Sequence, residues 1–171
     1  MATSDDGDGR SLQERLAQRS RCFGCGPANE HGLHLRSVPA ADGEALVADW
    51  SPRPEHEAFA GFVNGGILGT LLDCHANWAA VHYLMRRDGL ERPPGCVTAE
   101  LAVRFLRPTP SRGPLRLTAR VVEALERSAT VEATVEAEGT VTATARGRFV
   151  AVGPGHPAFD RWRGDPATGK S

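Results

Sequence analysis

The chain of 171 residues is long enough for one domain with a hydrophobic core, and its 40% hydrophobic and 24% charged residues are typical of globular proteins. A formal net charge of −1 gives no electrostatic basis for binding nucleic acid or an anionic membrane. The acidic N-terminus lacks the pattern of a signal peptide, and no apolar run is long enough for a membrane span. We therefore expect a cytoplasmic protein whose cysteines are reduced.

The first part of the chain is predicted to contain a tail, a short helix and a hairpin. Residues 1–10 are expected to be disordered. Ser11 is followed three residues later by Glu, a capping-box pattern that favours a short helix over residues 11–20. After a loop rich in Gly, Pro and Asn, strands near residues 33–38 and 44–50 are expected to form the hairpin.

Residues 65–86 form the only long predicted helix, and it is apolar almost all round. Four segments with alternating apolar and polar residues follow it: 96–106, 115–125, 129–138 and 140–152. We expect them to form an antiparallel meander whose concave side covers the helix. This predicts an α+β fold, with one long central helix wrapped by a curved antiparallel sheet of about six strands. Residues 11–152 form the single domain, and 153–171 a peripheral loop or tail.

One carboxylate, Asp73, lies in the middle of this apolar helix. Burying a charge is costly unless specific groups compensate it. Asn64 is a good N-cap residue, and the N–H groups of Gly65 and Gly66 after it attract negatively charged oxygens. The two features together suggest acyl-transfer chemistry, with an oxyanion site at the helix N-terminus and Asp73 as nucleophile or base. The structural alternative is an Asp73 that caps a loop or pairs with an arginine in the core.

The spacing between Gly65 and Asp73 constrains this hypothesis. Eight residues of helix span about 12 Å, too far for one carbonyl carbon to contact both. Two antiparallel copies of the helix in a dimer would place Gly65 of one chain beside Asp73 of the other. The hypothesis therefore requires a homo-oligomer, a dimer or a tetramer, and predicts an inactive monomer.

Three segments resemble the PaaI-like branch of the hotdog-fold acyl-CoA thioesterases. They are CFGCGPANEHGLHL at 22–35, EHEAFAGFVNGGILGTLLDCHANWAA at 55–80 and VTAELAVRFLRPTP at 97–110. The resemblance covers roughly residues 20–152. It implies the hotdog fold, subunits that pair through their sheets, and no cofactor.

The resemblance also implies roles for individual residues. Asp73 would be the catalytic carboxylate, acting on the thioester directly or through water. Gly65 of the partner subunit would polarise the thioester carbonyl, with Asn64 as the helix cap, and Thr98 would orient the water. Arginines would hold the CoA phosphates. The residues expected to contact substrate are Gly66, Asn77, His56, Arg104 and Arg107.

The sequence departs from the family at Asn64, where the family usually has His. Asn caps a helix and donates a hydrogen bond, but it does not titrate near neutral pH. Neither His56 nor His75 is an obvious substitute, since His75 lies about 200° around the helix from Asp73. The departure leaves three functions open. They are hydrolysis of an acyl-CoA or acyl carrier protein thioester, a biosynthetic reaction (dehydration, cyclisation or acyl transfer) in the same pocket, and acyl-CoA binding without chemistry.

The cysteines allow a metal site, but we expect none. Cys22 and Cys25, with His31 and His34 downstream, have a shorter spacing than zinc fingers use, so a packed thiol pair in a lid-like loop is the favoured interpretation. Cys74 lies mid-helix without an evident base, and buried thiols usually stay protonated.

Overall fold

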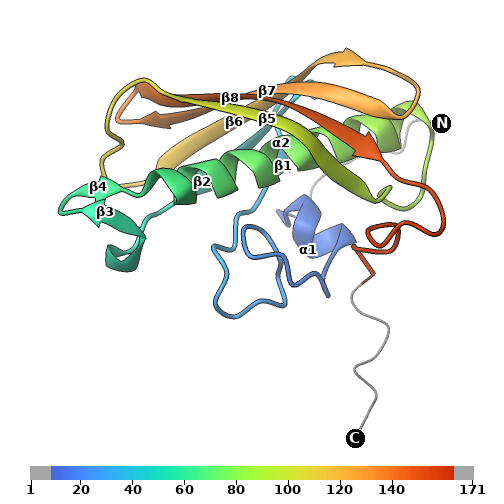
Figure 1. The fold of residues 1–171 in the computed structure, drawn as a ribbon, viewed down its shortest axis with the longest axis horizontal. Helices are drawn as coiled ribbons and strands as arrows, with labels where there is room; N and C mark the ends of the chain where they lie inside the picture. The colour runs from blue at the N-terminus through green and yellow to red at the C-terminus, as the bar shows by residue number, and fades with distance from the viewer. Residues whose placement is uncertain (1–8, 164–171) are drawn as a thin grey trace, which may run out of the picture.

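A computed structural model describes residues 9–163 (Figure 1). The elements in chain order are α1 (Leu12–Leu16), β1 (Val38–Pro39), β2 (Ala45–Trp50), the 3₁₀ turn η1 (Pro54–His56), β3 (Glu57–Phe59), β4 (Phe62–Val63), α2 (Gly65–Arg87), β5 (Cys96–Phe105), β6 (Leu115–Ala124), β7 (Ser128–Ala137) and β8 (Thr140–Ala151). Most of the predicted disordered tail, residues 1–8, lies outside the described part of the chain. Within residues 9–163, no helix is both long and apolar enough to cross a membrane.

Helix α2 lies along one face of a six-stranded sheet, which curves around it (Figure 1). The helix packs mainly against β6 and β7. Leu71 and Leu72 of the helix and Leu117 and Val135 of the sheet belong to one hydrophobic core, and all four are fully buried. Each such side chain contributes about 1.5–3 kcal/mol through burial, so the helix is held mainly by its apolar side chains. This is the predicted hotdog fold, one long helix wrapped by an antiparallel sheet of six strands.

The strand order corrects one sequence-based expectation. The order is β1-β2-β6-β7-β8-β5, with every neighbouring pair antiparallel. Strands β6, β7 and β8 form a meander, but β5 pairs with β8 instead of β6, so the predicted four-strand meander is wrong. The reason is that β2 occupies the edge of β6 that β5 would need. Alternation of apolar residues identifies a strand and its buried face, but not which strand lies next to it.

The N-terminal elements are shorter than predicted. The short helix covers five residues and retains the predicted capping box, in which Ser11 Oγ accepts from the N–H of Glu14 and the Glu14 carboxylate accepts from the N–H of Ser11. The strand expected at 33–38 is reduced to β1, because His34 has a positive φ of 54° that interrupts an extended chain. The small β3–β4 pair between the hairpin and α2 was not predicted.

The segment after β8 belongs to the core more than the sequence predicts. Its described part has no helix or strand, as expected of a loop. Yet Trp162 is buried, its ring centroid lies 4.6 Å from that of Trp78, and its Nε1 donates to the Pro94 carbonyl at 2.8 Å. Arg161 beside it donates to the Cys96 carbonyl at 2.5 Å. This segment therefore closes the end of the sheet near β5 and is not peripheral.

Candidate active site

Asp73 and Thr98 form the chemical centre of the candidate site. Thr98 Oγ1 on β5 donates a hydrogen bond to Asp73 Oδ1 on α2 at 2.7 Å. The register of β5 shifts between Thr98 and Glu100, and such β-bulges redirect side chains next to functional sites. Both partners keep part of their surface exposed. The carboxylate is therefore held in one position and still reachable by a small molecule.

Four effects act on the ionisation of Asp73, two in each direction. Burial raises the pKa of Asp73 above its ordinary value. The hydrogen bond from Thr98 and the positive charge of Arg161 both lower the same pKa. The Cys22 sulfur acts with burial to raise it. A carboxylate with a raised pKa is a better proton acceptor than an ordinary surface Asp, which suits a general base.

The N-terminus of α2 presents one backbone donor to solvent. Asn64 Oδ1 accepts from the N–H of Gly66 at 2.7 Å and from the N–H of Ile67 at 3.3 Å. Leu68 N–H donates to the Asn64 carbonyl at 3.1 Å. Among the hydrogen bonds of the described residues, none uses the N–H of Gly65. The cap therefore satisfies Gly66, expected from sequence to contact substrate, and leaves Gly65 as the available donor.

Phe105 limits the space beside that donor. A Cβ added at Gly65 would lie 3.3 Å from the Phe105 ring, tighter than ordinary van der Waals contact. The Phe105 side chain is 56% exposed, although it is a large hydrophobic group. A glycine at this position thus keeps a gap between an exposed aromatic ring and a helix N–H.

The two parts of the candidate site lie at different points along one helix. Strand β5 runs beside α2 with Thr98 at Asp73 and Phe105 at Gly65. The eight-residue separation of Gly65 and Asp73 corresponds to about 12 Å of helix. Within one chain, therefore, the carboxylate and the backbone donor do not meet.

Two other predicted site residues have structural partners. Asn77 is buried, its Nδ2 faces the Cys96 carbonyl at 3.5 Å, and within the described residues its Oδ1 has no partner. His56 is also buried, with Nδ1 accepting from the N–H of Arg53 at 3.0 Å and its ring 5.0 Å from that of Trp50. Burial lowers the pKa of His56, so the ring is neutral at pH 7. Among the hydrogen bonds of residues 9–163, none joins either side chain to Asp73.

His75 belongs to the core on the other side of α2. Its Nδ1 lies 2.9 Å from Ser37 Oγ and its Nε2 lies 3.1 Å from the Leu46 carbonyl. Gln13 of α1 also donates to Ser37 Oγ, at 3.1 Å, so this network ties α1 to α2. Complete burial lowers the pKa of His75 to about 4. The imidazole is therefore a neutral structural group.

The two arginines expected to bind CoA lie near the Gly65 end of the site. Arg104 pairs with Thr144 in the β5–β8 ladder, one residue before Phe105. Arg107 follows β5, and its N–H approaches the Thr142 carbonyl at 3.3 Å. Both side chains are exposed. Phe105 faces α2, and neighbouring residues of a strand point to opposite faces, so the Arg104 side chain points away from α2.

Two residues near Asp73 were missed from the sequence. Arg161 comes from the segment after β8, and its charge acts on Asp73 and on Cys96. Cys22 comes from the loop after α1. Neither position has a spacing relation to Asp73, and only the folded chain brings them together.

The thiols form a larger cluster than the predicted pair. The sulfur atoms of Cys22, Cys25 and Cys74 all lie within 4.8 Å of one another, and Cys22 Sγ is 3.6 Å from Cys74 Sγ. Hydrogen bonds with the other two sulfurs lower the pKa of the Cys22 thiol, and the same contacts, with burial, raise the pKa of Cys74. The two histidines downstream of the Cys-x-x-Cys pair do not take part. His31 is exposed, and His34 Nδ1 contacts Arg36 at 3.1 Å.

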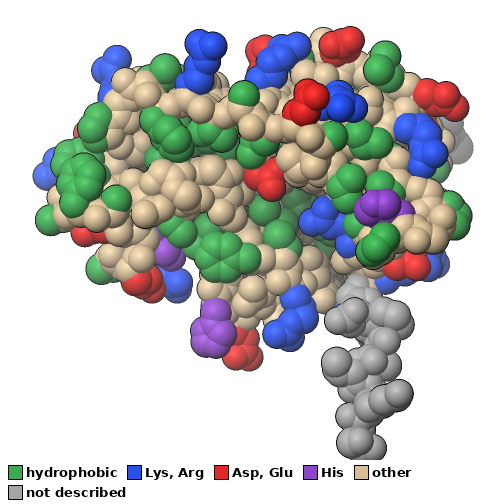
Figure 2. All heavy atoms as spheres, in the orientation of Figure 1, with side chains coloured by type: hydrophobic (Ala, Val, Ile, Leu, Met, Phe, Trp, Pro, Cys, Tyr) green, Lys and Arg blue, Asp and Glu red, His purple; other side chains and the backbone are tan. Residues whose placement is uncertain are grey.

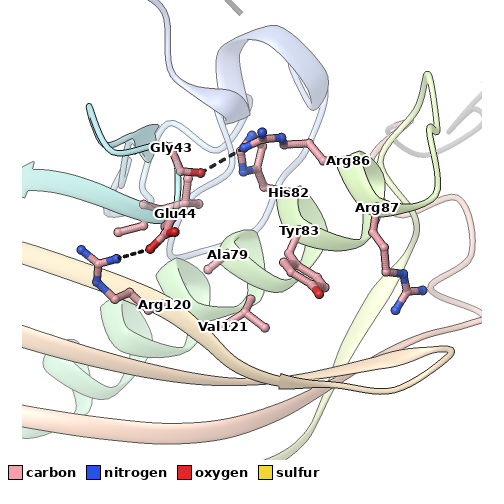
Figure 3. A pocket seen from close by; sticks show the side chains of 11 residues that line it. Gly43, Glu44, Ala79, His82, Tyr83, Arg86, Arg87, Arg120 and Val121 are labelled. Atoms are coloured by element: carbon pink, nitrogen blue, oxygen red, sulfur yellow. Dashed lines mark hydrogen bonds and ion pairs between the residues drawn. The ribbon is translucent and has the colours of Figure 1, made fainter. Parts of the chain in front are cut away.

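A separate pocket lies near the C-terminal end of α2 (Figure 3). It has a volume of about 680 Å³ and includes several arginines, but not Asp73. Arg86 donates to the Gly43 carbonyl at 3.0 Å, and Arg120 pairs with Glu44 and with Asp42. Figure 3 shows these side chains turned toward their protein partners. Arg120 is ion-paired and Arg86 is held by a backbone carbonyl, so we do not assign substrate binding to this pocket.

The face of the molecule drawn in Figure 2 is mixed in character. Hydrophobic side chains lie across its middle, while arginines lie mainly around its rim. Phe23, Phe59, Phe105 and Leu106 are among the large hydrophobic residues that are at least half exposed. Such exposed apolar groups mark surfaces that contact a ligand or another chain.

Comparison with known proteins decides the family. The sequence profile of the thioesterase superfamily matches residues 60–144, which include α2, Asp73 and Thr98. A thioesterase superfamily protein from Shewanella loihica PV-4 is 31% identical, with a TM-score of 0.59 over 74% of this chain and 98% of that one. The chain belongs to the thioesterase superfamily. The family predicted from the sequence motifs is thus confirmed.

Two further solved structures connect this superfamily member to more specific proteins. A putative thioesterase from Ralstonia eutropha JMP134, described as phenylacetic acid degradation-related, is 25% identical, with a TM-score of 0.58 over 70% of this chain and 86% of that one. A Bacillus halodurans protein solved with CoA is also 25% identical, with a TM-score of 0.57 over 71% of this chain and 76% of that one. None of the curated proteins matches the chain.

Proposed function

We propose that this superfamily member hydrolyses an acyl-CoA thioester, or the equivalent acyl carrier protein thioester, to free acid and thiol in the cytoplasm. The observation that carries the proposal is the Asp73–Thr98 pair. A partly buried carboxylate with a raised pKa is oriented by a 2.7 Å hydrogen bond on the one helix that the superfamily profile covers.

The proposed step uses water and balances without a cofactor. Asp73 takes a proton from a water molecule, and the resulting hydroxide attacks the thioester carbonyl carbon. The C–S bond of the tetrahedral intermediate then breaks, and the leaving thiolate takes up the proton that Asp73 accepted from water. Thr98 fixes Oδ1 of the carboxylate, so the other oxygen, Oδ2, is available to the water. Direct attack by Asp73 would instead form an anhydride that water then hydrolyses.

The oxyanion of that intermediate requires a donor, which we assign to Gly65 of the partner subunit. The hydrogen bonds of the Asn64 cap do not use the Gly65 N–H. Gly65 lies about 12 Å along the helix from Asp73 of the same chain. Strand β5 is an edge of the sheet, and its backbone can pair with a second copy. Antiparallel pairing of two β5 strands brings two α2 helices side by side in opposite directions. Each carboxylate then meets the other chain's N-terminus.

CoA is the favoured carrier of the acyl group. A structurally similar protein binds CoA, and Arg104 and Arg107 lie exposed beside the Gly65 end of the proposed site. Arginine side chains form strong charge-assisted contacts with phosphates. The arginines would therefore hold the phosphates while the thioester enters between Phe105 and the helix N-terminus.

Asn64 leaves two alternatives that the test must separate. Its Oδ1 is used by the helix cap, and it supplies no titratable group in place of the family's usual His. Acyl transfer, dehydration or cyclisation would use the same pocket without releasing free acid. An acyl-CoA binder would leave the thioester intact.

The test is to incubate the protein with short, medium, long and aromatic acyl-CoAs and to measure thiol and free acid separately. Equal amounts of both products, with turnover, are the expected result. Release of thiol without free acid would indicate acyl transfer and not hydrolysis. Binding with neither product would contradict hydrolysis, and the mass of the recovered ester would then separate dehydration from binding without chemistry.

A further inference from the structure

Three cysteine sulfurs meet beside α2 in an arrangement suited to a metal ion. Cys22, Cys25 and Cys74 supply sulfurs that all lie within 4.8 Å of one another, and the Cys22–Cys74 distance is 3.6 Å. Zinc bound by thiolates at about 2.3 Å in a tetrahedron requires sulfurs about 3.8 Å apart. The cluster is therefore close to the size of a zinc site before any ion binds.

The loop that carries two of these sulfurs is shaped to hold them against the helix. Gly26 N–H donates to the Cys22 carbonyl at 2.8 Å and closes a tight turn around the Cys-x-x-Cys segment. A Cβ at Gly24 would overlap Cys74 Sγ and crowd the Thr70 side chain, so only glycine lets the loop come this close. The close approach of loop and helix serves the sulfur cluster directly.

Hydrogen-bond donors surround the sulfurs. The backbone N–H groups of Gly24 and Cys25 act on the Cys22 sulfur. The indole Nε1–H of Trp78, one turn along α2, donates to Cys25 Sγ at 3.4 Å. Donors directed at sulfur stabilise the thiolate form that metals bind, and metal sites depend on such an outer layer.

We propose that Cys22, Cys25 and Cys74 bind one Zn²⁺, with a water or small ligand in the fourth position. Within residues 9–163 the cluster contains no His, Asp or Glu, and thiolates favour zinc over magnesium or calcium. Cys22 is half-buried, which leaves solvent access for the fourth ligand. Zinc binding releases the three thiol protons and fixes the loop after α1 against α2 beside Asp73. This differs from the expectation of no metal, because no spacing relation links Cys74 to the Cys-x-x-Cys pair.

The first test is a metal titration of the wild-type chain. Protein expressed with added zinc and purified without chelator should contain one zinc per chain by elemental mass spectrometry. After zinc is removed, one equivalent of Co²⁺ should produce thiolate-to-cobalt charge-transfer absorption and the intense visible bands of a tetrahedral site. A folded apo-protein that gives neither signal would overturn the proposal. So would an intact mass two daltons below that of the reduced chain, since it would mean that the cluster holds a disulfide.

Matched variants locate the site. Cys22→Ser, Cys25→Ser and Cys74→Ser should each lose cobalt absorption and the zinc-dependent rise in melting temperature. Cys96→Ser is the control, because Cys96 is buried but lies outside the cluster, and it should keep both. Retention of full binding by Cys74→Ser would contradict the three-thiolate site. The readout does not use thioester turnover, so the result is independent of the proposed hydrolase activity.

Discussion

At the scale of single residues, the protonation state and the orientation of the Asp73 carboxylate depend on the Thr98 hydroxyl. Burial alone would favour the protonated acid, which cannot accept a proton from water. The Thr98 hydrogen bond opposes that effect and also fixes the orientation of the carboxylate. Thr98 is thus a positioning residue for the proposed base.

Replacing Thr98 with Val should shift the pH dependence of catalysis. The hydrogen bond lowers the pKa of Asp73, so its loss raises that pKa. The base works when deprotonated, and the acidic limb of the kcat–pH profile should therefore move to higher pH. We expect kcat at pH 7 to fall about ten-fold or more, since a hydrogen bond to a charged group contributes about 1.5–3 kcal/mol.

The control for that experiment is Thr98→Ser, which keeps the hydroxyl. It should retain the wild-type pH profile. If Val and Ser variants share one profile, the hydroxyl does not act on the carboxylate.

Some residues of the candidate site are readable from sequence and others are not. Asp73 stands out because it is a lone charge in an apolar helix, and Asn64 because it precedes two glycines. Arg161 and Cys22 carry no such signal. They approach Asp73 from the two ends of the domain, so their proximity exists only once the sheet and its flanking loops have formed.

At the scale of elements, the first turn of α2 is built to leave one donor unused. Gly65 is the first helical residue, and Asn64 before it has extended backbone angles of φ −61° and ψ 133°. Proline is favoured at a first helical position, and it prefers an extended residue before it. The backbone donor can therefore be removed with little cost to the helix.

Gly65→Pro should abolish catalysis while leaving the fold intact. The substitution deletes the N–H proposed to bind the oxyanion, and loss of one such donor lowers kcat by about 100-fold or more. The melting temperature should stay near the wild-type value. Both quantities can be measured on the same preparation by thiol release and thermal denaturation.

Two alanine variants control for the added bulk. Gly65→Ala keeps the N–H but places a methyl group near Phe105, so it should retain more activity than the proline variant. Gly69→Ala has open space around the new Cβ in the single chain, but Gly69 lies between Gly65 and Asp73 on the same face of α2, so this variant tests whether added bulk there disturbs the paired helices. Equal activity of Gly65→Pro and Gly65→Ala would remove the backbone donor from the mechanism.

The sequence predicted helices and strands more reliably than it predicted which strands pair with each other. The bounds of α2 agree with the sequence within about a residue, because Asn64 marks its start and the apolar pattern ends near Arg87. Strands β5 to β8 were also recognised from their alternation. The position of β5 next to β8 was not predicted. The pairing partner of β5 depends on which edge of the sheet the β1–β2 hairpin leaves open.

At the scale of the whole molecule, the account requires two chains. The carboxylate and the backbone donor of one chain lie apart along α2, and β5 forms an edge of the sheet. Closed two-fold pairing would create two equivalent sites, each with one component from each chain.

Co-expression of two inactive variants with different tags tests this arrangement. Asp73→Asn chains retain Gly65, and Gly65→Pro chains retain Asp73. A mixed dimer regains one complete site of two, so a statistical mixture should recover about a quarter of wild-type activity. Each homodimer alone serves as the control. Recovery no greater than the sum of the two controls would place both groups in one chain and contradict the shared site.

The most direct test of the central claim is thiol release from an acyl-CoA panel by wild type and Asp73→Asn. The substitution is nearly isosteric and keeps a partner for Thr98, so the fold should persist while the base is lost. We predict turnover by wild type on at least one acyl-CoA and a loss of about 100-fold or more in the folded variant. A folded Asp73→Asn variant that keeps wild-type turnover would show that Asp73 does not carry the chemistry.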